Sequence, residues 1–186
     1  MTANMIDVSA WQHPNGEAID WHAVARSGIK AAMVKATEGT SYANPYLVQD
    51  VWGARAAGLL VGCYHFSHPG LTEPEEQAAY ALGVVDKLPL TLGLANDFEV
   101  TEGLPWDKLS PWARGFHTYT RTKQHLAPLY LNRYFADNLP GFPWALNIWL
   151  ASPGAVPRYQ VWAWQSGAGQ VPGVPGDCDV NILFDL

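Results

Sequence analysis

The sequence is poor in charged residues and in cysteine and has no long apolar run, and each shortage excludes a class of protein. Only 15% of its 186 residues are charged and 48% are hydrophobic, which is typical of one folded domain and not of a disordered chain. No apolar run approaches the roughly 20 residues that a membrane-spanning helix needs, so we expect no membrane insertion. Cys63 and Cys178 are the only cysteines, which is too few for a disulfide framework.

Basic residues are also scarce. There are 11 Lys and Arg residues against 17 Asp and Glu residues, and the formal net charge is −6. This balance provides no basic footprint for nucleic acid and no attraction to an anionic membrane surface, so we expect neither as a partner. The first residues lack the basic region and apolar stretch of a signal peptide, so no such peptide is expected.

Segments typical of strands alternate with segments typical of helices through the first two thirds of the chain. Apolar runs predict the strands, and caps, prolines and glycines place the helix ends, with Asn44-Pro45, Thr72-Glu73-Pro74-Glu75 and Ser110-Pro111 as helix starts. The predicted strand–helix pairs are residues 5–9 and 21–27, 29–36 and 45–57, 59–66 and 72–87, 92–99 and 110–125, and 128–132 and 133–139. This alternation predicts a mainly parallel sheet with crossover helices.

The last third of the chain has strand patterns without helices between them. The predicted strands are residues 146–150, 159–165 and 178–184, and the Gly/Pro-rich loops 152–157 and 167–176 separate them. Eight strands are enough to close a barrel. We therefore expect one α/β domain over residues 1–186, an irregular TIM-barrel-like fold of five strand–helix units followed by three strands.

Asp97 and Glu99 follow a buried, apolar strand. Residues two apart share one face of a strand, so the two carboxyl groups are expected side by side. Their mutual repulsion raises one pKa and leaves the other group ionised, which provides the proton donor and the anion that glycosidic bond cleavage requires. From the pair alone, a solvated strand end or a pair of metal ligands is the alternative interpretation.

Two further acids are expected at the same end of the barrel, where the chemistry of parallel barrels lies. Asp7 lies in the first strand, and Asp179 begins the last strand, which neighbours the first if the barrel closes. Asp177 competes with Asp179 for this position. The alternative role for Asp7 and Asp177 is that of a turn or capping residue.

Several residues near strand ends have two interpretations each. Tyr64 either hydrogen-bonds a sugar or packs in the core, and Glu38 is either a third acid at the mouth or the partner of a nearby Lys or Arg. His65 and His68 have a spacing that metal ligands use, but a structural role with satisfied hydrogen bonds is the alternative. Aromatic and amide side chains at other strand ends are either sugar-binding platforms or core residues: Trp11, Trp149, Trp162, Trp164 and Gln165.

Several segments together resemble glycoside hydrolase family 25, the muramidases of the Chalaropsis type. The segments that carry the resemblance are residues 6–12 (IDVSAWQ), 19–21 (IDW), 34–42 (VKATEGTSY) and 56–66 (AAGLLVGCYHF), then Asp97-x-Glu99, Trp164-Gln165 and Asp179-Val180-Asn181. The resemblance extends over essentially the whole chain in the family's order. One departure is Ala95-Asn96, where family members often have an aliphatic run before the first acid.

The resemblance implies a flattened (β/α)5(β)3 barrel that hydrolyses the β-1,4 bond between N-acetylmuramic acid and N-acetylglucosamine in peptidoglycan. By the family's pattern, Glu99 is the general acid/base and Asp97 orients the substrate's own N-acetyl group, a substrate-assisted mechanism. Asp7 and Asp179 match further acids of the cleft and complete the expected catalytic set. The expected substrate-binding set is Tyr64, Trp11, Glu38, His65, Trp149, Trp164 and Gln165.

The expected partner is the glycan strand of bacterial peptidoglycan, bound by a monomer that needs no metal and no cofactor. The expected place of action is the cell wall, reached either as a phage endolysin or as the mature domain of a secreted enzyme. Two rival functions are considered. One is a metal-dependent polysaccharide deacetylase that uses Asp7, His65, His68 and Asp97, and the other is a non-catalytic sugar-binding module.

Overall fold

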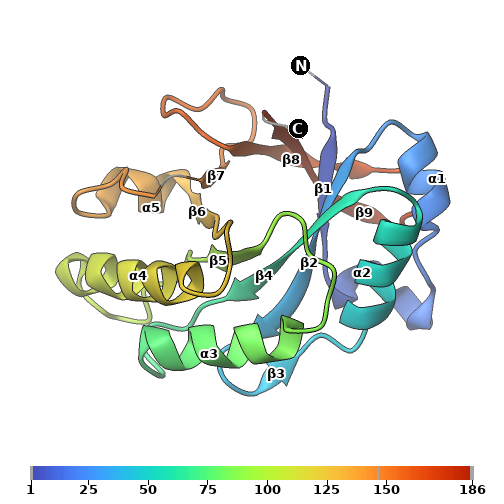
Figure 1. Ribbon diagram of the computed structural model, residues 1–186. Coiled ribbons are helices and arrows are strands. Elements are labelled where there is room, and N and C mark those ends of the chain that lie inside the picture. The colour runs from blue at the N-terminus through green and yellow to red at the C-terminus, as the bar shows by residue number, and fades with distance from the viewer. Residues whose placement is uncertain (1, 146, 185–186) are drawn as a thin grey trace.

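The strands of this protein form one sheet that curls into a closed barrel (Figure 1). A computed structural model describes residues 2–145 and 147–184. Within them the strands are β1 (Met5–Val8), β2 (Ala31–Glu38), β3 (Tyr42–Ala43), β4 (Leu60–Phe66), β5 (Leu94–Asp97), β6 (Leu129–Asn132), β7 (Ile148–Ala151), β8 (Ala163–Gln170) and β9 (Asp177–Leu183). The helices are α1 (Trp21–Arg26), α2 (Leu47–Ala56), α3 (Pro74–Val85), α4 (Trp106–Arg121) and α5 (Arg133–Asn138), with the short 3₁₀ turns η1 (Ala10–Gln12) and η2 (Pro14–Gly16).

Pairing of β1 with β2 closes the barrel. The sheet order is β1-β9-β8-β7-β6-β5-β4-β2-β3, and the extra β1–β2 pairing leaves only β3 outside the ring of eight strands. The pairs from β1 through β2, β4, β5, β6 and β7 to β8 are parallel, whereas β9 is antiparallel to both β8 and β1. The predicted barrel of five strand–helix units and three strands is thereby confirmed, and β3 is an addition to it.

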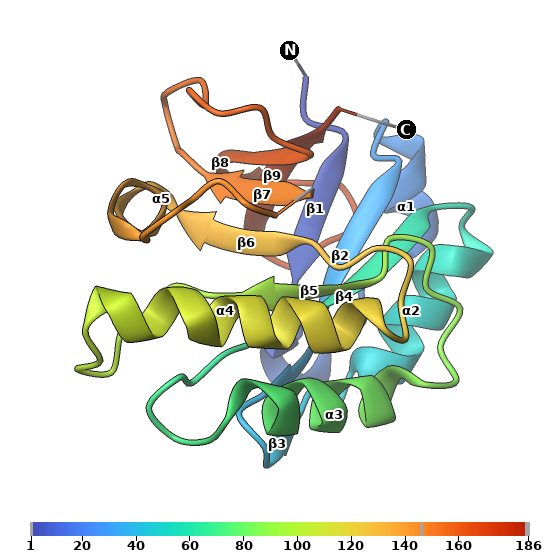
Figure 2. The same cartoon turned by 60° about the vertical axis from the view of Figure 1, so that its left-hand side comes forward.

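Helices cover one side of the barrel more fully than the other. In both ribbon views α3 and α4 lie side by side on the outside of the sheet, and α2 and then α1 lie farther along it, whereas β7, β8 and β9 are joined by loops (Figures 1 and 2). Along each strand, side chains point alternately into the barrel and outward toward the helices. In β5, Leu94 packs toward the helices and Ala95 packs inside the barrel with Met33 and Trp149. The inward face of β5 therefore leads to Asp97.

Three helix starts differ from their predicted positions. Helix α2 begins at Leu47, because Asn44 instead accepts hydrogen bonds from Tyr46 N and Leu47 N in a turn before it. The capping box predicted at Thr72 is wrong: the N-cap of α3 is Glu73, without a side-chain hydrogen bond. Helix α4 begins five residues before Pro111, at Trp106.

Burial explains the position of Pro111 inside α4. Proline lacks an N–H group, so it costs the helix one backbone hydrogen bond. The buried stripe of Leu109, Trp112 and Phe116 is continuous on both sides of it. Burial of this stripe against β5 and β6 outweighs the lost hydrogen bond.

Strand β8 lies further along the chain than predicted. It covers residues 163–170, so part of the predicted loop 167–176 is strand. Its partner explains the shift, because β9 pairs with it from Ala163↔Leu183 to Gln170↔Asp177, with an irregularity between Gln165 and Gly167. Strand β7 begins at Ile148, and the predicted strand start at Leu146 lies outside the described residues.

Candidate active site

A cleft of about 180 Å³ opens where the parallel strands of the barrel end. Polar and aromatic residues from β1, β2, β4, β5, β6, β7, β8 and β9 meet there. The lining consists of Asp7, Ser9, Trp11, Lys35, Tyr64, Phe66, Asp97, Glu99, Tyr130, Trp149, Gln165 and Asp179. All four predicted catalytic acids are therefore brought together in one place.

Asp97 is the last residue of β5 and is only 7% exposed. Its Oδ1 atom is buried and has no hydrogen-bond partner among the described residues. Burial raises the pKa of Asp97 well above its usual value, and the nearby charge of Glu99 raises it further. Asn96 lies on the other face of the strand, where it accepts a hydrogen bond from Ser67 Oγ at 2.6 Å, so the departure at Ala95-Asn96 does not alter the cleft.

Glu99 lies two residues beyond Asp97, in the segment after β5, and is half-buried. Burial raises the pKa of Glu99, while a hydrogen bond from Asn132 at the end of β6 and the charge of Lys35 oppose the rise. The net direction is upward for both carboxyl groups. A pair of this kind retains a proton at a pH where isolated carboxyl groups are ionised, and can therefore act as a proton donor.

Asp7 is held by two amide side chains. Its Oδ2 atom accepts hydrogen bonds from Asn181 Nδ2 at 2.8 Å and from Gln165 Nε2 at 3.2 Å. Burial and the charge of Asp179 raise the pKa of Asp7 to about 7, and these two hydrogen bonds limit the rise. The amides are fixed in turn, because Tyr130 OH donates to Gln165 Oε1 at 3.0 Å and Trp149 Nε1 donates to Asn181 Oδ1 at 2.7 Å.

The aromatic residues of the cleft differ in accessibility. Trp149 is 2% exposed and forms part of the floor, so it is not an open platform. Tyr64 points inward from β4 and makes an edge-to-face contact with Trp149, with a centroid distance of 6.3 Å. Trp11 is 88% exposed at the rim. Its turn η1 is held by the reciprocal capping of Ser9 and Gln12.

Three predicted substrate-binding residues do not line the cleft. His65 was wrongly placed there: it points from β4 toward the helices, is fully buried, and contacts Thr37 Oγ1 at 2.8 Å and Gln77 Oε1 at 3.1 Å. Trp164 donates through Nε1 to Ser152 O outside the lining. Glu38 lies on the rim. It forms an ion pair with Lys35 at 2.6 Å, as its alternative interpretation predicts.

Sequence reasoning missed several residues that shape the site. Lys35 provides the one positive charge of the lining, and its charge lowers the pKa of both Asp97 and Glu99. Tyr130 and Asn132 come from β6, which ends at the same mouth as β5. The rule that chemistry lies at the C-terminal ends of parallel strands could have found both β6 residues.

The two histidines of the rival deacetylase site do not join Asp7 and Asp97 in the cleft. His65 uses both ring nitrogens within the helical layer, and His68 lies between Glu38 and Glu102. Within residues 2–145 and 147–184, no group of three or more His, Cys, Asp or Glu side chains is arranged to hold a metal ion. Among these residues, every helix is also too short or too polar to cross a membrane.

A closed barrel with two carboxyl groups of raised pKa at the end of a parallel strand is an arrangement that hydrolysis of glycosidic bonds can use. The chain belongs to glycosyl hydrolases family 25, whose family profile matches residues 6–174.

Characterised relatives agree with this assignment. The chain is 30% identical over 169 residues to an autolytic lysozyme of Clostridium acetobutylicum, covering 88% of this chain and 52% of that protein. It is 30% identical over 197 residues to lysozyme M1 of Streptomyces globisporus, covering 95% of this chain and 66% of that protein. The chain thus spans between half and two thirds of the length of these two relatives.

Solved structures share the fold. The bacterial lysozyme from Streptomyces coelicolor superposes with a TM-score of 0.82 at 26% sequence identity, covering 98% of this chain and 92% of that one. A family 25 glycosyl hydrolase from Bacillus anthracis superposes with a TM-score of 0.83 at 22% identity, covering 97% and 88% of the two chains. The barrel described above is therefore the fold of this family.

Proposed function

We propose that this domain is a lysozyme that hydrolyses the β-1,4 bond between N-acetylmuramic acid and N-acetylglucosamine in peptidoglycan. The observation that supports it is the placement of Asp97 and Glu99, both with raised pKa, in one cleft at the end of β5. Membership of family 25 and the lysozyme relatives give the substrate class.

The proposed first step uses the substrate's own acetamido group. Asp97 accepts a hydrogen bond from the acetamido N–H through its unpartnered Oδ1, which turns the carbonyl oxygen toward the anomeric carbon. The carbonyl oxygen bonds to this carbon while the glycosidic bond breaks. Glu99 donates its proton to the leaving oxygen.

In the second step water attacks the anomeric carbon of the cyclic intermediate. Glu99, now ionised, takes a proton from this water, and the acetamido group is released. Two inversions at the same carbon give net retention, so the product keeps the β configuration.

The two carboxyl groups differ in how well they bear charge. Before substrate binds, the proton of the pair resides more readily on Asp97, because Asp97 is the more buried and Glu99 accepts a hydrogen bond from Asn132. An acetamido N–H at Oδ1 stabilises ionised Asp97. Substrate binding therefore favours the state in which Glu99 carries the proton, which is the reactive one.

The negative charges of the cleft also suit the transition state. Positive charge develops on the sugar ring as the glycosidic bond breaks, and preorganised anions stabilise such charge. Asp7, fixed by Asn181 and Gln165, and Asp179 opposite it supply this negative potential when ionised. They do not transfer the proton in this proposal.

The test is digestion of purified peptidoglycan, followed by mass spectrometry of the fragments. Fragments with N-acetylmuramic acid at the new reducing end are expected. Glu99→Gln should reduce activity by about 10²-fold or more while the fold is retained, because the substitution removes the proton donor. Glu76→Gln, at an exposed position on α3, is the matched control and should digest normally. Wall binding without fragments would instead support the sugar-binding module, and loss of acetyl groups would support a deacetylase.

We further infer that the domain acts as a monomer on the cell wall, reached by secretion or by release as an endolysin. The cleft is complete within one chain, because its lining draws on eight strands of the same barrel. Light scattering of the purified domain should give the mass of one chain, 20.4 kDa. A dimer mass at working concentration would contradict the monomer.

A further inference from the structure

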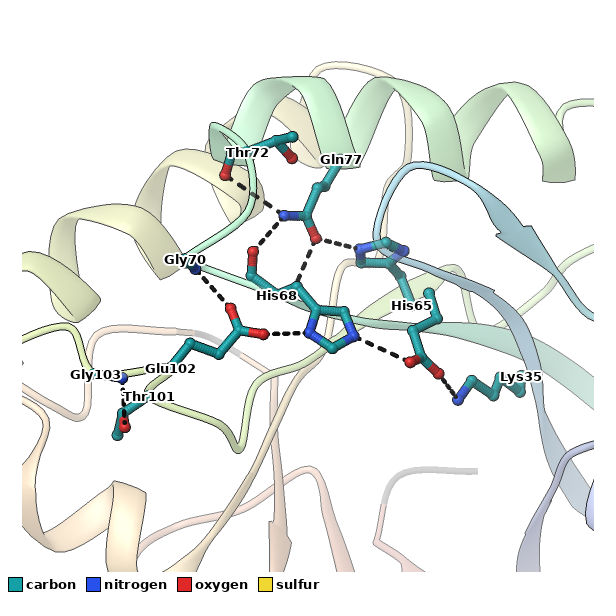
Figure 3. Close-up of polar contacts among 10 residues, drawn as sticks. Lys35, His65, His68, Gly70, Thr72, Gln77, Thr101, Glu102 and Gly103 are labelled. Carbon is teal, nitrogen blue, oxygen red and sulfur yellow. Dashed lines mark hydrogen bonds and ion pairs between the residues drawn. The ribbon is translucent and has the colours of Figure 1, made fainter.

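A row of charged side chains lies on the rim of the cleft, apart from the carboxyl groups of the proposed reaction. His68 is its centre: Nε2 lies 3.0 Å from Glu38 Oε1, and Nδ1 lies 2.5 Å from Glu102 Oε1. Figure 3 shows the His68 ring next to Glu102, with Lys35 beyond its other edge. A carboxylate only accepts hydrogen bonds, so both ring nitrogens must donate, and His68 is an imidazolium ion in this arrangement.

The outer oxygens of both carboxylates are also occupied. Glu38 Oε2 accepts a hydrogen bond from Lys35 Nζ at 2.6 Å, and Glu102 Oε2 accepts one from Gly70 N at 2.7 Å. We call Lys35, Glu38, His68 and Glu102 the His68 bridge. The bridge joins the end of β2, the loop from β4 to α3 and the loop from β5 to α4.

One end of the bridge lies in the cleft, and the other lies on the loop that carries Glu99. Lys35 lines the cleft, where its charge lowers the pKa of Asp97 and Glu99. Glu102 lies three residues after Glu99 on the same loop. It has a φ of 48°, in the left-handed region that residues other than glycine avoid, and its carboxylate contacts hold it there.

We propose that His68 is a positioning residue of the glycosidase reaction. Its imidazolium holds Lys35 in the cleft through Glu38 and holds the Glu99 loop through Glu102. Loss of the ring proton releases both. The inference rests on the proposed function for its effect on turnover, but the bridge itself can be tested without it.

The groups around His68 determine when it loses its proton. Partial burial lowers the pKa of His68, but the hydrogen bonds and charges of Glu102 and Glu38 outweigh this effect, so the pKa is raised. The other charged or titratable groups nearby are Lys35 on β2 and His65 on β4, and Gln77 on α3 bonds the backbone N–H and carbonyl of His68. The bridge is therefore closed at neutral pH and opens as pH rises through the raised pKa, when one ring nitrogen presents a lone pair to a carboxylate.

Nuclear magnetic resonance titration of the His68 ring tests the bridge directly. Glu102→Gln removes one of the two carboxylates, so the His68 midpoint should fall by about one pH unit, a tenfold loss of proton affinity. His22→Gln, on the exposed face of α1, is the matched control and should leave the His68 midpoint unchanged. An unchanged midpoint in Glu102→Gln would overturn the bridge, whatever the enzyme cleaves.

Kinetics with soluble glycan fragments test the positioning role. In Glu102→Gln, the pH above which kcat declines should be lower by the same amount as the His68 midpoint. KM should be nearly unchanged, because a loosened Lys35 and a loosened Glu99 loop affect the reacting state. His68→Arg keeps a permanent cation between the two carboxylates and should restore turnover on the alkaline side, whereas His68→Gln should not. Equal pH profiles for the wild type and all three variants would overturn the role. If the wild type releases no fragments, the proposed function fails, and the NMR titration still decides the bridge.

Discussion

Asp7 and Asp179 are register partners across the antiparallel pair of β1 and β9. Both line the cleft, and the charge of Asp179 is one of the causes that raise the pKa of Asp7 to about 7. Replacing Asp179 with Asn removes this repulsion, so the pKa of Asp7 should fall, by about one unit. Carbon-13 NMR titration of the Asp7 carboxyl group measures the shift. Asp177→Asn, two residues earlier and exposed, is the control, and an equal shift in both variants would contradict the pairing.

Burial of Asp7 should make the stability of the domain depend on pH. The pKa of Asp7 is raised from 3.8 to about 7 on folding, so the folded state binds this proton more tightly than the unfolded state. The associated stabilisation is complete below pH 4 and is lost as pH rises through 7, by up to about 4 kcal/mol. Urea unfolding of the wild type and Asp7→Asn at pH 5 and 8 measures it. The difference in the free energy of unfolding between pH 5 and pH 8 should be smaller in Asp7→Asn than in the wild type. An equal difference would show that other groups are responsible.

Trp11 should contribute to substrate binding and not to stability. Its side chain is 88% exposed, so Trp11→Ala loses little buried surface and should leave the free energy of unfolding within about 0.5 kcal/mol of the wild type. Loss of an aromatic stacking surface at the rim should raise KM by about three- to tenfold with kcat nearly unchanged. Trp52→Ala, at a 54% exposed position on α2, is the control. The same change in KM for both variants would show that Trp11 has no special position.

Gly93, just before β5, should be the least replaceable glycine among the described residues. It has a φ of 70°, and a Cβ atom there would lie 2.0 Å from Leu126 O. Gly93→Ala should cost about 3 kcal/mol or more, from backbone strain and the clash together. Gly58→Ala has a similar φ of 86° but no atom within 4 Å, so it should cost only about 1 kcal/mol. Equal denaturant midpoints for the two variants would contradict the clash.

Local sequence patterns predicted the parts of the fold that do not depend on which strand a segment pairs with. The alternation of apolar runs with capped helices was enough to predict five strand–helix units, because each such unit is marked by its own residues. Strand β8 shows the limit. Gly167 and Gly169 indicate a loop by composition, yet they pair with Val180 and Cys178 of β9, which lie 13 and 9 positions further along the chain.

The sequence predicted the positions of the acids in the candidate site better than the positions of the residues that contact them. Strand β5 ends at Asp97, two residues before the predicted strand end at Glu99, yet both acids line the cleft. Alternation along β4 separates Tyr64 inside from His65 outside. The amides that hold Asp7 come from β8 and β9, so their contacts depend on barrel closure and on the antiparallel registers, which no local pattern encodes.

The reversed direction of β9 has a practical consequence for handling this domain. Strand β9 starts near the cleft, which Asp179 lines, and ends at Leu183 beside the start of β1, where Asn4 bonds both the N–H and the carbonyl of Leu183. The first and last strands therefore lead to described residues on the face opposite the cleft. An affinity tag, surface anchor or fluorescent reporter fused at either end would stand clear of an incoming polymer. Immobilised or tethered forms should consequently keep the open mouth directed away from their support.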